Sequence, residues 1–319
     1  MKDITRRDFL GTVGTGAASL ALAGCAGTAT KDLVQPIESG FKPSDKVTLK
    51  IKGAVKPFDF VHITDIHLSQ CDSRDPELID YLAKRKKTFK QPEKTAKRLF
   101  KHINTLKTDF IAVTGDYVDV PTQANLELGG ELFDSLDTGY EFSVGNHEWA
   151  GQAIPPDRDY WRSRFSVWTP QPMDWFYRRI NGVNLLFLDD SDYQITEYQL
   201  KRTKALLDMG RPCILFVHIP IIVDSLLPFV TKRWGMPICL GGEPNASHYQ
   251  RRISWGMGPE VKQTTNEFIK LLKSHPQMKA IFAGHLHFDH KGQYQNGCHQ
   301  YVTGAAFENV YRKIEIVPG

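Results

Sequence analysis

Five short polar motifs in this 319-residue chain carry side chains that bind transition metals in proteins. In chain order they are Asp65-Ile66-His67, Gly115-Asp116-Tyr117-Val118-Asp119, Gly145-Asn146-His147-Glu148, the single His218, and Gly284-His285-Leu286-His287. Imidazole and carboxylate groups suit Zn, Mn and Fe. Each motif alone arises often by chance, and a single histidine after an apolar strand is more often structural. The ordered set as a whole predicts a metal site.

The motifs follow short apolar runs that are typical of β-strands. The expected strands cover residues 58–63, 110–114, 140–144, 183–188, 213–217 and 279–283, and residues 292–317 look like closing strands. Amphipathic segments at 92–106, 125–136, 196–209 and 262–274 predict helices between several of them. This alternation favours an α/β sandwich. Ligands bind at the carboxyl ends of strands in open α/β sheets, so we expect the polar side chains to share one rim.

The five motifs together resemble those of the calcineurin-like metallophosphoesterase superfamily. The pattern of that superfamily is D-x-H, G-D-x-x-D, G-N-H-[DE], a single His and G-H-x-H, and the resemblance extends over residues 58–304. It implies an α/β fold, the metallophosphatase four-layer sandwich of two mixed β-sheets flanked by helices. It also implies an enzyme, a metal-dependent phosphoric ester hydrolase. Purple acid phosphatases have Tyr at the position of Asp119 and lack a His at that of His67, so the chain departs from that subgroup.

The resemblance further implies a dinuclear site with two divalent metal ions, which would be Mn, Zn or Fe. Asp116 would bridge the ions. The other implied ligands are Asp65, His67 and His287 at the first ion and Asn146, His218 and His285 at the second. A metal-bridging hydroxide would attack phosphorus in line, since metal binding lowers the pKa of water toward ~7. Gly115, Gly145 and Gly284 would let the backbone turn sharply beside the metals.

His147 adjoins the implied ligand Asn146 but is not a ligand in the superfamily. The resemblance implies that His147 acts at the leaving oxygen as a general acid or as a charge stabiliser. Asp119 would hold its other ring nitrogen and favour the imidazolium. A plain turn residue is the alternative for Asp119, and we expect Glu148 to lie behind the ligands.

The first residues are typical of a targeting segment. Thr5-Arg6-Arg7-Asp8-Phe9-Leu10 precedes a weakly apolar stretch that is too short to span a bilayer, and Leu22-Ala23-Gly24-Cys25 follows. These residues resemble a twin-arginine export signal and a lipoprotein processing box. We therefore expect a signal peptide at 1–24, a tether at 25–46 and the metallophosphoesterase domain at 47–319. A soluble exported form and a cytosolic protein with a frayed basic start stay open.

The expected partners follow from these features. They are a phosphate-ester substrate, the twin-arginine export machinery, and the membrane, to which an acylated Cys25 would anchor the chain on the extracytoplasmic side. The net charge of +4 and the pI of about 8.6 predict no specific nucleic-acid partner. The densest basic run, between Lys84 and Arg98, is typical of a solvated helix face; contact with anionic lipid or a phosphorylated substrate is the alternative. No C-x-x-C pair suggests a thiolate zinc site.

The substrate is expected to be a phosphodiester or a phosphomonoester outside the cytoplasm. Two alternatives stay open: a pyrophosphatase acting on a nucleotide-linked lipid, and a catalytically inactive surface lipoprotein that has kept the fold. Two segments rich in aromatic and basic residues, 149–172 and 224–258, are candidate walls of the substrate pocket. The sequence does not identify individual substrate-binding residues.

Overall fold

The computed structural model describes residues 40–149, 163–165, 168, 171–242, 250, 253, 257–258, 260–295 and 297–319. The expected signal peptide, Cys25 and most of the tether lie outside the described residues, and their assignment stays a prediction. A compact unit runs from Phe41 to Gly319. Strand pairing within it begins at β1 (Lys42–Pro43), ahead of residue 47, where we expected the domain to start. Among the described residues, no helix has the length and apolarity needed to cross a membrane.

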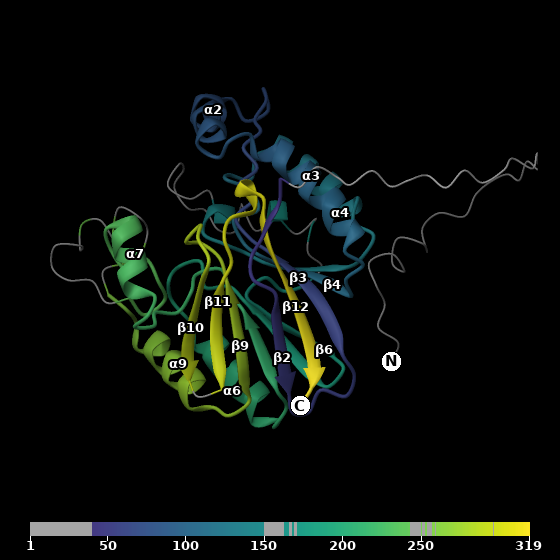
Figure 1. The fold of residues 1–319 in the computed structure, drawn as a ribbon. Coiled ribbons are helices and arrows are strands. Elements are labelled where there is room, and N and C mark those ends of the chain that lie inside the picture. The colour runs from purple at the N-terminus through teal and green to yellow at the C-terminus, as the bar shows by residue number, and fades with distance from the viewer. Residues whose placement is uncertain are drawn as a thin grey trace, which may run out of the picture. The chain divides into compact units, whose positions relative to one another are not determined.

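Two six-stranded sheets form the centre of this unit (Figure 1). The first has the order β1-β12-β3-β4-β5, with β2 also paired to β12. Its further strands are β2 (Val47–Ile51), β3 (Phe58–Ile63), β4 (Phe110–Thr114), β5 (Tyr140–Ser143) and β12 (Val310–Pro318). Strands β3, β4 and β5 are parallel and β12 is antiparallel to β3, so the sheet is mixed.

The second sheet has the order β10-β11-β9-β8-β7-β6 and is also mixed. Its strands are β6 (Trp175–Ile180), β7 (Val183–Leu188), β8 (Cys213–Phe216), β9 (Met278–Ala283), β10 (His290–Gln295) and β11 (Cys298–Val302). The four central strands β7, β8, β9 and β11 are parallel, and the edge strands β6 and β10 pair antiparallel. Parallel strands covered on both faces read as continuous apolar runs, which explains why they were recognisable in the sequence.

An aromatic core joins the two sheets face to face. The Phe60 ring of β3 lies 5.4 Å from that of Phe216 on β8 and 5.5 Å from that of Phe282 on β9, between ring centroids. The neighbouring residues Val61 and Ile63 point to the opposite face of the first sheet, where they pack with helical residues. Helical residues cover the outer face of the second sheet in the same way. The predicted four-layer α/β sandwich is thereby confirmed.

The helices are α2 (Ile79–Thr88), α3 (Pro92–Thr105), α4 (Gln123–Asp134), α6 (Glu197–Asp208), α7 (Leu227–Trp234) and α9 (Gln263–Ser274), with short 3₁₀ turns η1 (Pro76–Leu78), η2 (His147–Trp149) and η4 (Ala306–Glu308). All expected strands and helices are present, with ends within two residues of the predicted ones. A capping box of Thr196 and Gln199 begins α6, as its sequence favours. The sequence did not predict α2, which is basic and buries only Leu82 within its length.

Candidate metal centre

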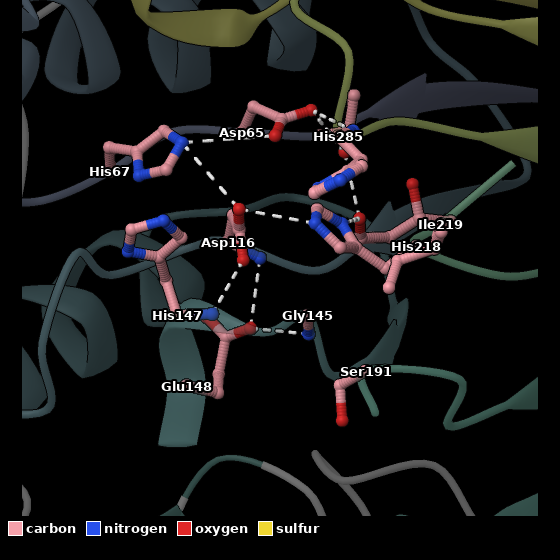
Figure 2. Close-up of polar contacts among 12 residues, drawn as sticks. Asp65, His67, Asp116, Gly145, His147, Glu148, Ser191, His218, Ile219 and His285 are labelled. Carbon is pink, nitrogen blue, oxygen red and sulfur yellow. Dashed lines mark hydrogen bonds and ion pairs between the residues drawn. The ribbon is translucent and has the colours of Figure 1, made fainter. Parts of the chain in front are cut away.

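Seven of the residues singled out by sequence follow the carboxyl ends of five strands. Asp65 and His67 follow β3, Asp116 follows β4, Asn146 follows β5, His218 follows β8, and His285 and His287 follow β9. These strands belong to both sheets, so the shared rim is built by two sheets whose strand ends meet. Figure 2 shows Asp65, His67, Asp116, His218 and His285 converging from these loops.

Strained backbone marks this rim. Asp65, His67, Asp116, His285 and His287 all have positive φ, between 49° and 68°. Such left-handed conformations cost roughly 1 kcal/mol or more for residues other than glycine, and they cluster at functional sites. A glycine is required next to them, because a Cβ on Gly284 would stand 1.8 Å from Thr64 Oγ1 and 2.6 Å from Asp65 Oδ2.

A first group of possible ligand atoms comprises Asp65, His67 and His287, all within 4.8 Å of one another. His67 Nε2 lies 3.1 Å from His287 Nε2, and His287 Nε2 lies 3.3 Å from Asp65 Oδ1. His67 Nε2 is 3.7 Å from Asp116 Oδ2. Two imidazole nitrogens and two carboxylate oxygens therefore face a common point.

A second group comprises Asp116, His218 and His285. His218 Nε2 lies 3.1 Å from Asp116 Oδ2, the same oxygen that faces His67 in the first group. Figure 2 shows Asp116 between His67 and His218. One carboxylate oxygen thus lies between the two groups, where a bridging ligand would have to be.

The residues present fit two metal ions. Four buried atoms at the rim have no hydrogen-bond partner among the described residues: Asp65 Oδ1, His67 Nδ1, Asn146 Oδ1 and His218 Nε2. Buried polar atoms of proteins are normally paired, so such orphans indicate a missing partner. Nitrogen and oxygen ligands at ~2.0–2.2 Å from one ion stand roughly 3–3.5 Å apart, which matches the spacing in both groups.

The electrostatics of the rim also favour bound cations. Burial works to lower the pKa of His218, but the Asp116 carboxylate outweighs it and raises this pKa to about 10. Burial likewise opposes a charged His67, yet the nearby Asp119, Asp65 and Asp116 carboxylates raise its pKa to about 9. The buried carboxylates therefore attract positive charge into the site.

In two of the histidines, a protein group binds the ring nitrogen that does not face the other ligands. His218 Nδ1 lies 2.8 Å from the carbonyl oxygen of Thr114, and His285 Nε2 lies 2.9 Å from the Tyr193 hydroxyl. The Phe89 ring stacks on His67 at 4.1 Å between centroids. Such contacts fix the orientation and tautomer of metal-binding imidazoles.

His147 lies beside the two groups and is held by Asp119. Its Nδ1 is 3.0 Å from Asp119 Oδ1 and 3.1 Å from the Asp119 carbonyl oxygen, while its backbone N–H donates to Asp116 Oδ1 at 2.9 Å. Asp119 therefore contacts Nδ1 of His147, and its role stays a proposal. The role of a proton donor for His147 stays a proposal.

Glu148 supports the loops from behind the rim. Its carboxylate accepts the backbone N–H groups of Gly145, Asp116 and Tyr117 at 2.5, 2.8 and 2.7 Å. Burial and the nearby Asp116 charge raise the pKa of Glu148 to about 7. This side chain connects the loops after β4 and β5 and so positions Asp116 relative to Asn146.

Sequence reasoning missed three residues of this site. Tyr193 and Asp190 belong to the loop after β7, where Asp190 Oδ1 accepts the backbone N–H groups of His218 and Ile219, both at 3.1 Å. The polar run Asp189-Asp190-Ser191-Asp192 directly after an expected strand was a usable signal. Arg85 was missed because it lies within the basic run, which the sequence favoured as a solvated helix face. It instead pairs with the buried Asp119.

Of the two segments proposed as pocket walls, 149–172 lies largely outside the described residues, whereas most of 224–258 is described. In the described part of the first, Arg164 pairs with Asp75 at 3.3 Å. In the second, the Trp234 ring at the end of α7 lies 5.7 Å from that of His287, between centroids. Cys71, Cys213, Cys239 and Cys298 are all free.

Two groups of Asp and His ligands that share Asp116, at the strand ends of a four-layer α/β sandwich, define a dinuclear metallohydrolase. The sequence profile of the calcineurin-like phosphoesterases matches residues 58–289, and the chain belongs to this family. The family is one of phosphoric ester hydrolases with dinuclear divalent metal centres, and the chain is accordingly a metallophosphoesterase. The identity of the metals is open.

Comparison with solved structures finds similar chains at low identity. A dimetal phosphatase from Danio rerio is 11% identical, with a TM-score of 0.51, over 79% of this chain and 88% of that chain. Purple acid phosphatase PPD1 from yellow lupin seeds is 13% identical, with a TM-score of 0.48, over 81% of this chain and 46% of that chain. Phosphopantetheinyl hydrolase from Mycobacterium tuberculosis is 13% identical, with a TM-score of 0.43, over 80% and 92%. No curated protein matches significantly.

Proposed function

We propose that this enzyme hydrolyses a phosphodiester or a phosphomonoester outside the cytoplasm, with His147 as the group that serves the leaving oxygen. The observation that carries the proposal is the position of Asp116 Oδ2, 3.1 Å from His218 Nε2 and 3.7 Å from His67 Nε2, with the His147 backbone bound to the other oxygen of the same carboxylate. The metal ligands and the candidate proton donor are therefore fixed by one side chain.

Two divalent ions held by these ligands would supply a water of lowered pKa and neutralise charge on the phosphoryl oxygens. The protein groups have separate tasks. Asp119 Oδ1 accepts a hydrogen bond from His147 Nδ1–H, so the proton that can reach the leaving oxygen is the one on Nε2. The stacked Phe89 keeps the His67 ring in the orientation that directs Nε2 into the first ligand group.

Turnover of two model esters tests the proposal. We expect the purified protein, supplied with Mn or Zn, to hydrolyse bis(p-nitrophenyl) phosphate or p-nitrophenyl phosphate, and the ratio of the two rates decides between diester and monoester. His218→Gln should abolish turnover, whereas His299→Gln on β11 should not change it. Absence of turnover with either metal, for both esters, would refute the proposed function.

The proposed location has its own test, since Cys25 and the arginine pair lie outside the described residues. We propose export through the twin-arginine route and anchoring by acylation of Cys25. Arg6→Lys with Arg7→Lys should stop export, because lysine does not reproduce the paired guanidinium groups. Cys25→Ser should release the protein from membranes, because the acylation site is gone. Unchanged membrane fractionation of the Cys25 variant would contradict the lipoprotein assignment.

A further inference from the structure

Arg85 on the last turn of α2 binds the buried carboxylate of Asp119 with two hydrogen bonds. Arg85 Nε donates to Asp119 Oδ2 at 2.8 Å, and Arg85 Nη2 donates to Asp119 Oδ1 at 2.7 Å. The Asp119 side chain is 0% exposed and that of Arg85 is 27% exposed. A planar guanidinium that binds both oxygens fixes the plane of a carboxylate as well as its charge.

The oxygen fixed in this way serves the reaction site. Asp119 Oδ1 lies 3.0 Å from His147 Nδ1 and 3.5 Å from His67 Nδ1. The terminal torsion of aspartate is broad, so a carboxylate held only by imidazoles can rotate. Arg85 removes that freedom, and the same oxygen then faces the candidate proton donor and an assigned metal ligand.

Arg85 is itself held by aromatic packing. Its guanidinium lies 4.5 Å from the centroid of the Phe89 ring. Phe89 in turn stacks on His67, with ring centroids 4.1 Å apart and an angle of 10° between the ring planes. Phe89 directly follows the last residue of α2, four positions after Arg85, and its backbone N–H donates to the Arg85 carbonyl oxygen, so both side chains lie on the same face. A guanidinium on an aromatic face is stabilised by the ring quadrupole. The last turn of α2 thus reaches His67 through a ring and through a carboxylate.

We propose that Arg85 is a positioning residue for leaving-group protonation: by clamping Asp119 it fixes the orientation of His147. The inference rests on the proposed function, in which His147 serves the leaving oxygen. It assigns a task to α2, a helix whose sequence otherwise looks like a basic surface segment. Loss of Arg85 also leaves a buried carboxylate with fewer partners, so the test must separate positioning from stability.

The dependence of the rate on the leaving group separates a loss of positioning from a loss of stability. Arg85→Gln removes the guanidinium that donates two hydrogen bonds to Asp119. Lys87→Gln is the matched control, because Lys87 is an exposed cation on the same helix. We expect Arg85→Gln to keep both metal equivalents and to lose ~10–100-fold in kcat/KM for esters with alkyl leaving groups, part of the ~10²–10⁴ that a positioned acid contributes. The loss for p-nitrophenyl esters should be several-fold smaller, because p-nitrophenolate departs without a proton. Lys87→Gln should match the wild type.

A double-mutant cycle makes the second arm of the test. If Arg85 acts through His147, the variant with both Arg85→Gln and His147→Gln should be no slower than His147→Gln alone, within ~3-fold. Multiplicative losses, equal losses on both leaving groups, or loss of metal from Arg85→Gln would overturn the inference. Wild-type enzyme that turns over no ester would instead overturn the proposed function on which it rests.

A spectroscopic readout does not depend on turnover. In zinc-loaded protein with ¹⁵N-labelled histidine, the Nδ1 proton that His147 shares with Asp119 should give a downfield resonance that disappears in His147→Gln. We expect this resonance to be broadened or lost in Arg85→Gln and retained in Lys87→Gln. An unchanged resonance in Arg85→Gln would show that Asp119 holds His147 without the arginine, which overturns the inference.

Discussion

The Tyr193 hydroxyl lies 2.9 Å from Nε2 of His285, so a residue after β7 occupies one ring nitrogen of an assigned metal ligand after β9. Tyr193 adopts a left-handed backbone with φ of 59°, and its N–H donates to the carbonyl oxygen of Asp190 at 2.8 Å. The loop that holds this strained tyrosine also holds the backbone of His218 through Asp190. One loop therefore orients two histidines of the second ligand group.

Tyr193→Phe should weaken metal binding without unfolding the protein. The ring is retained, but His285 loses the partner of its Nε2, and the loss of such partners lowers metal affinity by ~10–100-fold. We expect one of the two metal equivalents to titrate with reduced affinity in calorimetry. The matched control is Tyr198→Phe, because Tyr198 is 55% exposed on α6. Equal metal affinities for wild type and Tyr193→Phe would show that the tyrosine does not orient His285.

Asp116→Asn should abolish ester hydrolysis and lower metal content. The carboxylate lies between the two ligand groups, and without its charge two divalent ions so close together repel each other more strongly. Metal analysis after dialysis should find fewer than two equivalents. Asp224→Asn, at an exposed position before α7, serves as the control. Two full equivalents together with normal turnover in Asp116→Asn would refute its assignment as the bridging ligand.

His147→Gln should keep the metals and slow the chemistry. His147 is not an assigned ligand, and a positioned proton donor contributes ~10²–10⁴ to the rate. The loss should be larger for alkyl esters than for p-nitrophenyl esters, measured as kcat/KM on matched substrates. Asp119→Asn should show a milder form of the same pattern, because Asp119 only orients the imidazole. Loss of metal from His147→Gln, or equal slowing of both kinds of ester, would make His147 a structural residue.

The pH dependence of stability should reveal that His62 is neutral and buried between the two sheets. Burial, followed by the Arg312 charge, lowers the pKa of His62 to about 3, and Thr303 and Thr114 bind its two nitrogens at 2.8 and 2.7 Å. The unfolded chain takes up a proton below pH ~6.5, whereas the folded chain does not. The contribution of His62 is therefore complete above pH ~6.5 and falls toward pH ~3, by about 2 kcal/mol between pH 6.5 and 5.

His62→Gln removes this titration but keeps polar atoms near both threonines. We expect its free energy of unfolding in urea to fall less steeply between pH 6.5 and 5 than that of the wild type. The comparison uses the slope with pH, so a uniform loss of stability in the variant does not affect it. His299→Gln should flatten the slope less than His62→Gln does, because the pKa of His299 is also lowered but its ring is only partly buried. Parallel curves for wild type and His62→Gln would contradict a neutral, buried His62.

The sequence by itself determined the fold class and the set of metal-binding motifs. Strands β3, β4, β7, β8 and β9 are covered on both faces, so their sequences are mostly apolar and stand out from their surroundings. The motifs were recognisable because each follows the end of such a run at short range. The order of residues along the chain was therefore enough to indicate candidate metal ligands such as Asp65, Asp116 and His285.

Only the tertiary structure decided which distant groups support the ligands. Arg85 and Asp119 are 34 residues apart, and Tyr193 and His285 are 92 apart, so no local pattern connects either pair. The sequence of α2 looks like a solvated cationic helix, because its four basic residues are consecutive and a single arginine turned inward among them leaves no periodic signal. Its pairing with Asp119 follows from the packing of α2 beside the strand ends, and that packing is set by contacts across the whole sandwich.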